Sequence, residues 1–192
     1  MTPVILASSS RYRATLLDRL GLEYEQLAPG IDESHQPGED PEAYVCRLAR
    51  EKAQAIATRM PDRVIIGSDQ CSSRDGEILG KPHTRERAIE QLLGFGGRRV
   101  RIATAVAVYD PDSARTQSAY VPTDVYFRRL ERSAVERYVD AESPLDCAGA
   151  FKAEGLGITL FEKIRGDDPN ALIGLPLIAL TDLLGRLGIK RP

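Results

Sequence analysis

A β-branched run that leads into a glycine and an aspartate most constrains how this chain can fold. Residues 64–66 are Val-Ile-Ile, a length and composition typical of a buried strand. Gly67 then allows the backbone to turn or to approach another segment closely. Ligands of open α/β sheets bind where strands end, so we expect Asp69 and Gln70 at the carboxyl end of this strand, in a binding site.

A turn signal, Asp-Gly at residues 75–76, leads from this strand to Gly-Lys-Pro at residues 80–82. The two segments predict a hairpin-like unit that carries Asp69 at one end and Lys81 at the other. A carboxylate can hold a metal or accept a proton from water, and an ammonium can offset phosphate charge. The pair is consistent with chemistry on a phosphate, but a hairpin with polar ends and no function would have the same sequence.

The composition is that of a soluble protein and excludes several classes. The 192 residues are 42% hydrophobic and 28% charged, and the net charge of -2 argues against a general nucleic-acid binder. The cysteines and histidines have no spacing that indicates a disulfide framework or a zinc site. Neither a signal peptide nor a membrane-spanning run is present. We therefore expect a cytoplasmic protein without membrane contact, folded as a single domain over residues 1–192.

The N-terminal segment has the order strand, serine-rich turn and helix. Residues 4–7 predict a buried strand, residues 8–10 are serines, and leucines between residues 16 and 20 mark one face of a helix. A helix N-terminus presents free N–H groups and a partial positive charge, to which Ser8 and Arg13 add donors. We favour a phosphate site here over serines that only cap the helix.

A long helix is predicted from residue 40, where Asp-Pro-Glu supplies an N-cap, a proline at N1 and an acidic first turn. Lys52 lies on the apolar stripe of this helix. Such a lysine either extends along the edge of the core to solvent or points into a cleft, and the pattern leaves both open. Asp32 and Glu33, in the loop that follows a strand predicted at residues 23–27, could bind a divalent cation or be solvated.

The second half of the chain predicts a long hairpin between helices. Thr84 can cap a helix that ends near Gly94. Alternating apolar residues from Val100 to Val108 and a return strand over residues 116–127 predict the hairpin, in which Pro122 implies an edge or a bulge.

Residues 133–136 then form a capping box for a short helix. The glycine-rich loop 146–157 contains Lys152 and Glu154 and either binds a ligand or is solvated. A strand over residues 158–164 and a last helix over residues 176–187 follow. This order predicts an α/β fold with a mixed sheet.

These segments together resemble the Maf family of nucleoside triphosphate pyrophosphatases over essentially the whole chain. The motifs are Ile5 to Ser10 with Arg13, Ile31-Asp32-Glu33, Arg47-Leu48-Ala49 with Glu51-Lys52-Ala53, Gly67-Ser68-Asp69, Gly80-Lys81-Pro82, Cys147 to Phe151, and Gly174-Leu175-Pro176. The resemblance implies an ITPase-like mixed sheet flanked by helices, with two lobes around a deep nucleotide-binding cleft. It also implies cleavage of a nucleoside triphosphate to monophosphate and pyrophosphate with a divalent cation, Mg or Mn.

Three positions make the chain most similar to the branch of the family that acts on 7-methyl-GTP. Tyr12, Gln70 and Glu154 stand where members that act on dTTP and UTP have arginine, threonine and glutamine. A methylated guanine is cationic, so Tyr12 can stack on it. Glu154 can accept hydrogen bonds from its N1–H and amino groups. Arg11 and Ala14 depart from the family's common proline and arginine, which bears on the geometry of the first helix.

The resemblance also implies a role for each candidate residue. Asp69 would orient or deprotonate the water that attacks the α-phosphorus, and Asp69 and Glu33 would be the metal ligands. Lys52 and Lys81 would offset the phosphate charge as it redistributes. The implied substrate contacts are Ser8 and Arg13 for the phosphates, Tyr12, Gln70 and Glu154 for the base, and Lys152 as a further residue facing the cleft.

Two other functions remain open from the sequence. The first is a pyrophosphatase of the dTTP/UTP type, which differs only in substrate. The second is a non-catalytic nucleotide-binding regulator of cell division that uses the same cleft. The family resemblance also suggests a homodimer, although no self-complementary surface is visible in the sequence.

Overall fold

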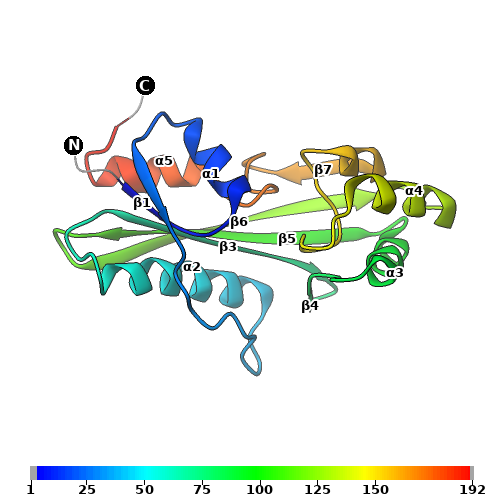
Figure 1. The fold of residues 1–192 in the computed structure, drawn as a ribbon, viewed down its shortest axis with the longest axis horizontal. Coiled ribbons are helices and arrows are strands. Elements are labelled where there is room, and N and C mark those ends of the chain that lie inside the picture. The colour runs from blue at the N-terminus through cyan, green and yellow to red at the C-terminus, as the bar shows by residue number, and fades with distance from the viewer. Residues whose placement is uncertain (1–3, 191–192) are drawn as a thin grey trace.

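The structure is a computed structural model that describes residues 4–190, and a mixed seven-stranded sheet forms its framework (Figure 1). The strands are β1 (Val4–Ala7), β2 (Tyr24–Leu27), β3 (Ile65–Arg74), β4 (Glu77–Leu79), β5 (Arg99–Asp110), β6 (Arg115–Phe127) and β7 (Phe161–Gly166). Their order is β2-β1-β3-β5-β6-β7, and β4 pairs with β3. β1 runs parallel to β2 and β3, whereas the other pairs are antiparallel. The predicted mixed sheet is confirmed.

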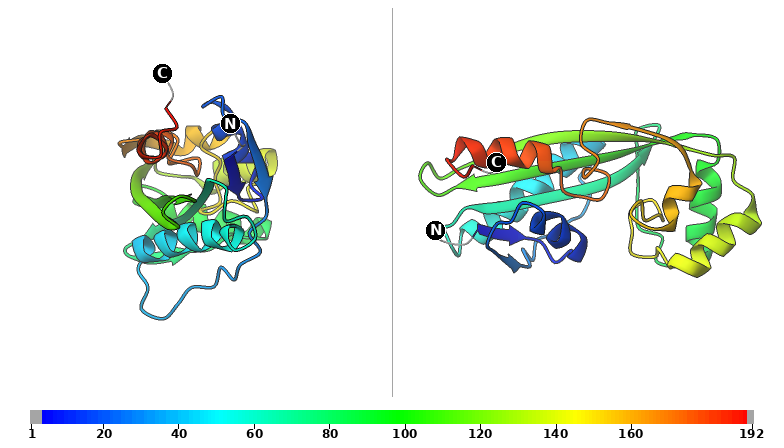
Figure 2. Two further views of the ribbon diagram at one scale, coloured as in Figure 1. Left: turned by 90° about the vertical axis from the view of Figure 1, so that its left-hand side faces the viewer. Right: turned by 90° about the horizontal axis from the view of Figure 1, so that it is seen from above.

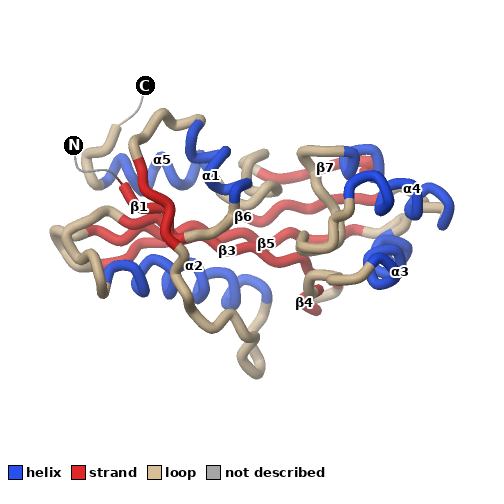
Figure 3. The backbone as a smooth tube through the Cα atoms, viewed as in Figure 1, coloured by secondary structure: helices blue, strands red, loops and turns tan. Residues whose placement is uncertain are grey.

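Helices cover both faces of this sheet (Figure 3). They are α1 (Arg11–Asp18), α2 (Pro41–Ala57), α3 (Arg85–Phe95), α4 (Arg132–Glu142), the 3-10 helix η1 (Leu156–Leu160) and α5 (Leu177–Arg186). α2 lies along one face, and α1 and α5 lie on the other (Figure 1). α3, α4 and η1 gather at the far end of the long strands, away from α1 and α5 (Figure 2).

Each of these ends has its own apolar core. At the first, Ile5 and Ile65 pack with Ile56 of α2, while Leu6 and Ile66 face the opposite side and pack with leucines of α1 and α5. This division follows from the alternation of side chains along a strand. The two faces of β1 and β3 therefore anchor the helices that later bring site residues together.

An aromatic cluster forms the core of the other end. The ring of Phe127 lies 5.1 Å from Phe95 of α3, 5.6 Å from Phe151 and 5.1 Å from Phe161, measured between centroids. The contacts of Phe127 with Phe151 and Phe161 are edge-to-face, an arrangement that stabilises beyond the buried area alone. These two packed ends correspond to the two expected lobes, and β3, β5 and β6 join them.

The strand predicted at residues 64–66 is much longer than expected, and the prediction that Asp69 lies at its end was wrong. β3 continues through Gly67 and Asp69 because both stay paired with β5. Gly67 instead permits a close approach, since a Cβ there would lie 2.1 Å from the carbonyl oxygen of Ala49 in α2. The pairing of β1 with β3 ends at Gly67, so Asp69 lies just beyond the carboxyl end of β1.

Two local predictions in the second half were also wrong. α4 begins at Arg132, because the carbonyl of Glu131 accepts hydrogen bonds from the N–H groups of Ala134 and Val135, so the predicted capping box at residues 133–136 does not form. The strand expected from residue 158 begins only at Phe161, after the 3-10 helix η1.

The other element predictions are confirmed within the described residues. The side chains of Asp40 and Thr84 cap α2 and α3, and the β3–β4 and β5–β6 hairpins form as expected. Pro122 lies on a locally unpaired edge of β6, because the pairing with β7 ends at Thr123. None of the helices in this part of the chain is long and apolar enough to cross a membrane.

Candidate functional site

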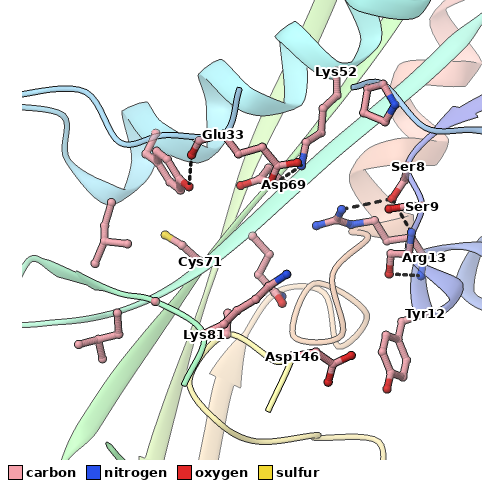
Figure 4. A pocket seen from close by; sticks show the side chains of 18 of the residues that line it. Ser8, Ser9, Tyr12, Arg13, Glu33, Lys52, Asp69, Cys71, Lys81 and Asp146 are labelled. Atoms are coloured by element: carbon pink, nitrogen blue, oxygen red, sulfur yellow. Dashed lines mark hydrogen bonds and ion pairs between the residues drawn. The ribbon is translucent and has the colours of Figure 1, made fainter. Parts of the chain in front are cut away.

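A pocket of about 650 Å³ lies between the two packed ends (Figure 4). One wall comes from the β1–α1 turn, α2 and the middle of β3. The other comes from the segment after β4 and the loop after α4. The side chains that line it are mainly charged or hydroxylated, which suits a highly charged ligand.

Lys52, Asp69 and Glu33 form an ion cluster inside this pocket (Figure 4). The Nζ atom of Lys52 lies 2.6 Å from Oδ1 of Asp69 and 2.9 Å from Oε1 of Glu33. The side chains of Lys52 and Asp69 are only 5% and 7% exposed, whereas that of Glu33 is 54% exposed. The sequence left two orientations open for Lys52, and the structure shows that it points into the pocket.

The packing of α2 on β3 produces this cluster. Gly67 and Asp69 share one face of β3, and Gly67 lets the backbone of α2 lie directly against the strand. Lys52 follows Ala49 by nearly one turn and therefore emerges beside Asp69. Because residue 67 is a glycine, α2 lies close enough to β3 for Lys52 and Asp69 to come into contact.

The β1–α1 turn forms a second group of donors. Ser10 caps α1 by accepting a hydrogen bond from the backbone N–H of Arg13, so the capping interpretation is correct for this serine. Ser8 is buried, and its hydroxyl oxygen accepts hydrogen bonds from Ser10 N at 3.1 Å and from Arg13 Nη1 at 3.4 Å. Ser8 and Arg13 both line the pocket, as expected for an anion site.

The guanidinium of Arg13 is held in a half-buried position. Its Nε donates to the carbonyl oxygen of Gly174 at 2.9 Å. Burial lowers the pKa of Arg13, and the nearby carboxylates of Asp69 and Glu33 act in the opposite direction. Arg13 is therefore close enough to the ion cluster for one ligand to contact both.

Lys81 enters the pocket from the opposite wall, after β4. The predicted hairpin unit therefore brings Asp69 and Lys81 to one cavity, although Asp69 lies within the strand and not at its end.

Tyr12 and Asp146 also point into the pocket (Figure 4). The guanidinium of Arg11 lies 4.9 Å from the centre of the Tyr12 ring, a cation–π geometry, and also donates to the Tyr12 hydroxyl at 3.0 Å.

Asp69 and Glu33 are the carboxylates that could hold the expected metal. Within the described residues, no group of three or more His, Cys, Asp and Glu side chains could hold a cation. Lys52 contacts one oxygen of each of the two carboxylates, and the second oxygens make no hydrogen bond within residues 4–190. Mg²⁺ is commonly bound by one or two carboxylates, with phosphates and waters as the remaining ligands. Two carboxylates in a phosphate site match that pattern.

Comparison with known proteins identifies the family. The family described as Maf-like protein matches residues 3–187. The chain belongs to the Maf family. Proteins named 7-methyl-GTP pyrophosphatase from Pseudomonas aeruginosa, Pseudomonas syringae pv. tomato and Xanthomonas campestris pv. campestris are 53%, 51% and 50% identical over 192 residues, covering 100% of both chains. Among solved structures, the Staphylococcus aureus Ham1 protein is similar over 67% of this chain and 73% of its own, with a TM-score of 0.48 and 18% identity.

Of the three residues that stay predictions as substrate contacts of this Maf protein, one lines the pocket and two lie outside its lining. Gln70 lines the pocket, but its Nε2 donates to backbone carbonyls of residues 171 and 172. Lys152 donates to the carbonyl of Glu142 at 2.6 Å, at the end of α4. Glu154 is exposed, and neither Lys152 nor Glu154 is part of the pocket lining.

Several lining residues were not found from the sequence. Tyr44 precedes Lys52 by two helical turns, so both residues lie on the same face of α2. Their i, i+8 spacing could have indicated from the sequence that Tyr44 lies near the site. Its hydroxyl donates to the carbonyl of Glu33 at 2.9 Å, and burial together with Asp69 raises its pKa to about 12. Cys71 follows Asp69 on the same face of β3, and burial and Asp69 raise the pKa of its thiol to about 12. A thiol with this pKa is protonated at neutral pH and is a poor nucleophile.

Proposed function

We propose that this Maf protein hydrolyses 7-methyl-GTP between its α and β phosphates, releasing 7-methyl-GMP and pyrophosphate. It is then a hydrolase of phosphoric anhydrides that removes a modified nucleotide. The ion cluster of Lys52, Asp69 and Glu33 carries this proposal, because it adjoins the anion site of Ser8 and Arg13 in one pocket. The names of relatives at 50 to 53% identity support the choice of substrate.

Asp69 acts on the attacking water. One carboxylate oxygen of this pocket-lining residue is held by Lys52, which leaves the other to accept a hydrogen bond from the water. The water oxygen bonds to the α-phosphorus, the bond from that phosphorus to the α–β bridging oxygen breaks, and pyrophosphate leaves. The proton lost by the water passes to Asp69 and then to solvent. Because a carboxylate is a weak base, its orientation of the water contributes at least as much as proton removal.

The cationic side chains bind the triphosphate, and those of Lys52 and Lys81 also offset the charge that develops on the leaving group. Lys52 and Arg13 reach the phosphates from one wall of the pocket, and Lys81 reaches them from the other. Donors fixed before the reaction stabilise developing charge without reorganisation, which makes them effective. Asp69 and Glu33 would hold a Mg or Mn ion, which supplies Lewis-acid polarisation of phosphate oxygens when it is bound.

The cationic base fits the Tyr12 side of the pocket. An aromatic face attracts a positively charged ring such as 7-methylguanine, and the Arg11 guanidinium occupies one face of Tyr12, so the base would stack on the other face. We assign recognition of the guanine edge to a carboxylate of the 146–157 loop. Asp146 lies in the pocket wall, whereas Glu154 lies outside the lining. Gln70 lines the same region, and we assign no substrate contact to Lys152 because Glu142 holds it.

Pyrophosphate release with Mg or Mn tests the function on 7-methyl-GTP, GTP, dTTP and UTP measured side by side. We expect a clear preference for 7-methyl-GTP. Preference for dTTP or UTP would leave the mechanism in place and refute the assignment of the base. Nucleotide binding without any hydrolysis would favour the regulator of cell division.

We also infer, from family resemblance alone, a cytoplasmic enzyme folded as one domain over residues 1–192 and assembled as a homodimer. Light scattering on the purified protein tests the assembly directly. A mass of one chain at micromolar concentration would refute the dimer without affecting the proposed chemistry.

A further inference from the structure

The loop over residues 168–176, which connects β7 to α5, is built as a rigid unit. The carboxylate of Asp168 is buried and accepts hydrogen bonds from Asn170 and, at 2.7 Å, from the backbone N–H of Ile178 in the first turn of α5. The carbonyl of Asn170 accepts from the N–H groups of residues 173, 174 and 175. The conformation of this loop is therefore fixed before any ligand binds.

Three polar side chains hold this loop against the sheet. The Ser68 hydroxyl, which has a single proton, lies within donor distance of two carbonyl oxygens, Gly174 at 2.9 Å and Ala105 at 2.8 Å. Thr104 donates to the carbonyl of Ala171 at 2.9 Å. Gln70 donates to the Ala171 carbonyl as well, at 2.7 Å. Ser68 and Thr104 are fully buried, and neither lines the pocket. Buried hydroxyl groups at apolar positions of a sheet cost free energy unless they are hydrogen-bonded, so these contacts constrain the loop strongly.

The loop in turn holds Arg13. The carbonyl of Gly174 accepts a hydrogen bond from Nε of Arg13 at 2.9 Å, and it lies 2.9 Å from the Ser68 hydroxyl, which it shares as an acceptor with the carbonyl of Ala105. With Nε fixed, the remaining guanidinium nitrogens face the pocket, where Nη1 reaches the hydroxyl of Ser8 at 3.4 Å. A continuous set of hydrogen bonds thus runs from the buried side of β3 to the anion site.

We propose that Ser68 and Thr104 are positioning residues for Arg13: they hold the 168–176 loop on the sheet, and the Gly174 carbonyl then aims the guanidinium at the substrate phosphates. The proposal rests on the function proposed above for the pocket. In this proposal β3 positions site residues from both of its faces. Asp69 lies on one face, in the ion cluster, and Ser68 lies on the other, against the loop. It also assigns the Gln70 amide to the loop.

The expected kinetic effect follows from where Arg13 acts. A mobile arginine must lose side-chain freedom when it binds phosphate, and a fixed one does not. Arg13 would contact the phosphates in both the ground state and the transition state. Loss of its fixed position should therefore raise KM and leave kcat almost unchanged.

Two substitutions of Thr104 form the matched test. Thr104→Val keeps the shape and removes the hydroxyl, whereas Thr104→Ser keeps the hydroxyl. We expect Thr104→Val to raise both the KM for nucleotide and the inhibition constant of pyrophosphate about five-fold, the effect of one neutral hydrogen bond. Thr104→Ser should stay close to the wild type in both quantities, and Ser68→Ala should behave like Thr104→Val.

Introducing Thr104→Val into an Arg13→Lys variant tests whether the increase in KM depends on the guanidinium of Arg13. Lysine lacks the Nε donor, so Thr104→Val should add no further change in KM there, which is the signature of two residues acting on one contact. An additive five-fold increase would overturn the proposal. So would a Thr104→Val variant that unfolds at a lower temperature while its KM and pyrophosphate inhibition remain those of the wild type.

The outcome is separable from that of the proposed function. If the wild type hydrolyses no nucleotide, the proposed function fails. Calorimetric binding of inorganic tripolyphosphate then gives the same comparison without turnover, with weaker binding expected only for Thr104→Val and Ser68→Ala. Equal binding by Thr104→Val and Thr104→Ser would refute the positioning role in that case also.

Discussion

At the scale of single residues, the site depends on a lysine that the helix pattern alone could not orient. Lys52 lies on the buried stripe of α2 and meets Asp69, which is 17 positions away in the chain. Local sequence indicated these residue types, because a carboxylate and cations suit chemistry on a phosphate. It could not predict the contact itself, since that requires the packing of α2 on β3.

The same limit applies to two expected substrate contacts that lie outside the lining of the pocket. Lys152 and Glu154 occupy a glycine-rich loop with the composition of a ligand loop, but Lys152 bonds to the end of α4. Asp146, in the same loop, lines the pocket instead. Composition located the loop, and only tertiary contacts decide which of its charged side chains faces inward.

Asp69→Asn should abolish most of the turnover and preserve nucleotide binding. The substitution keeps the shape but removes the negative charge that orients the water, so we expect kcat to fall about 10²- to 10⁴-fold. Pyrophosphate release gives kcat, and calorimetry gives the binding constant. Asp32→Asn is the matched control, since Asp32 is outside this pocket and bonds to Ser34. Near-normal turnover in Asp69→Asn would remove Asp69 from the mechanism.

Asp146→Asn should reduce the preference for the methylated base. The carboxylate interacts with a cationic 7-methylguanine and much less with neutral guanine. We therefore expect the ratio of kcat/KM for 7-methyl-GTP over GTP to fall about two- to five-fold, as for a partly exposed ion pair. Glu154→Gln is the comparison. If the ratio fell only in Glu154→Gln, recognition would belong to that residue.

At the scale of elements, the starts of α2 and α3 were predictable, whereas the length of β3 was not. Asp40 and Thr84 capped helices as expected, because an N-cap bonds to N–H groups within three residues of itself. The extent of β3 depended on its pairing with β5, more than 30 residues away in sequence, through pairs such as Asp69 with Ala105. The capping box at residues 133–136 failed because the carbonyl of Glu131 had already begun the helix.

Gly67→Ala should separate α2 from β3. A Cβ at this position would lie 2.1 Å from the Ala49 carbonyl oxygen and 2.9 Å from the Ala53 nitrogen, and neither backbone atom can rotate away. We expect a loss of about 1–3 kcal/mol in the free energy of unfolding, as for overpacked cores. We also expect kcat to fall, because Lys52 moves away from Asp69. Urea unfolding and pyrophosphate release measure the two quantities.

Gly185→Ala is the control for this prediction. Gly185 lies in α5, and a Cβ there would meet no atom within 4 Å. Alanine should leave stability unchanged or raise it by about 0.5–1 kcal/mol through its better helix propensity. Equal behaviour of the two variants would show that α2 tolerates displacement and that the close approach at Gly67 is not needed.

At the scale of the whole molecule, the pocket spans two separately packed ends. Ser8, Arg13 and Lys52 belong to the end that holds α1, α2 and α5, whereas Lys81 and Asp146 belong to the end built around Phe127. A nucleotide that contacts both walls must therefore connect the two ends. In the proposed function, the first end would bind most of the triphosphate, and the base would lie between Tyr12 and the second end.

Hydrogen exchange can separate these contributions in the Asp69→Asn variant, which should bind without turnover. With 7-methyl-GTP and Mg we expect slower exchange at the β1–α1 turn and in the loop around Asp146. Inorganic tripolyphosphate should protect the first region and leave the second almost unchanged, because it lacks the base. At a ligand concentration of 100 times Kd, binding should stabilise the folded state by about 2.7 kcal/mol, which makes the protection easy to measure. Protection confined to the β1–α1 turn with both ligands would mean that the base does not reach the Asp146 wall, and that Tyr12 recognises it without help from the second end.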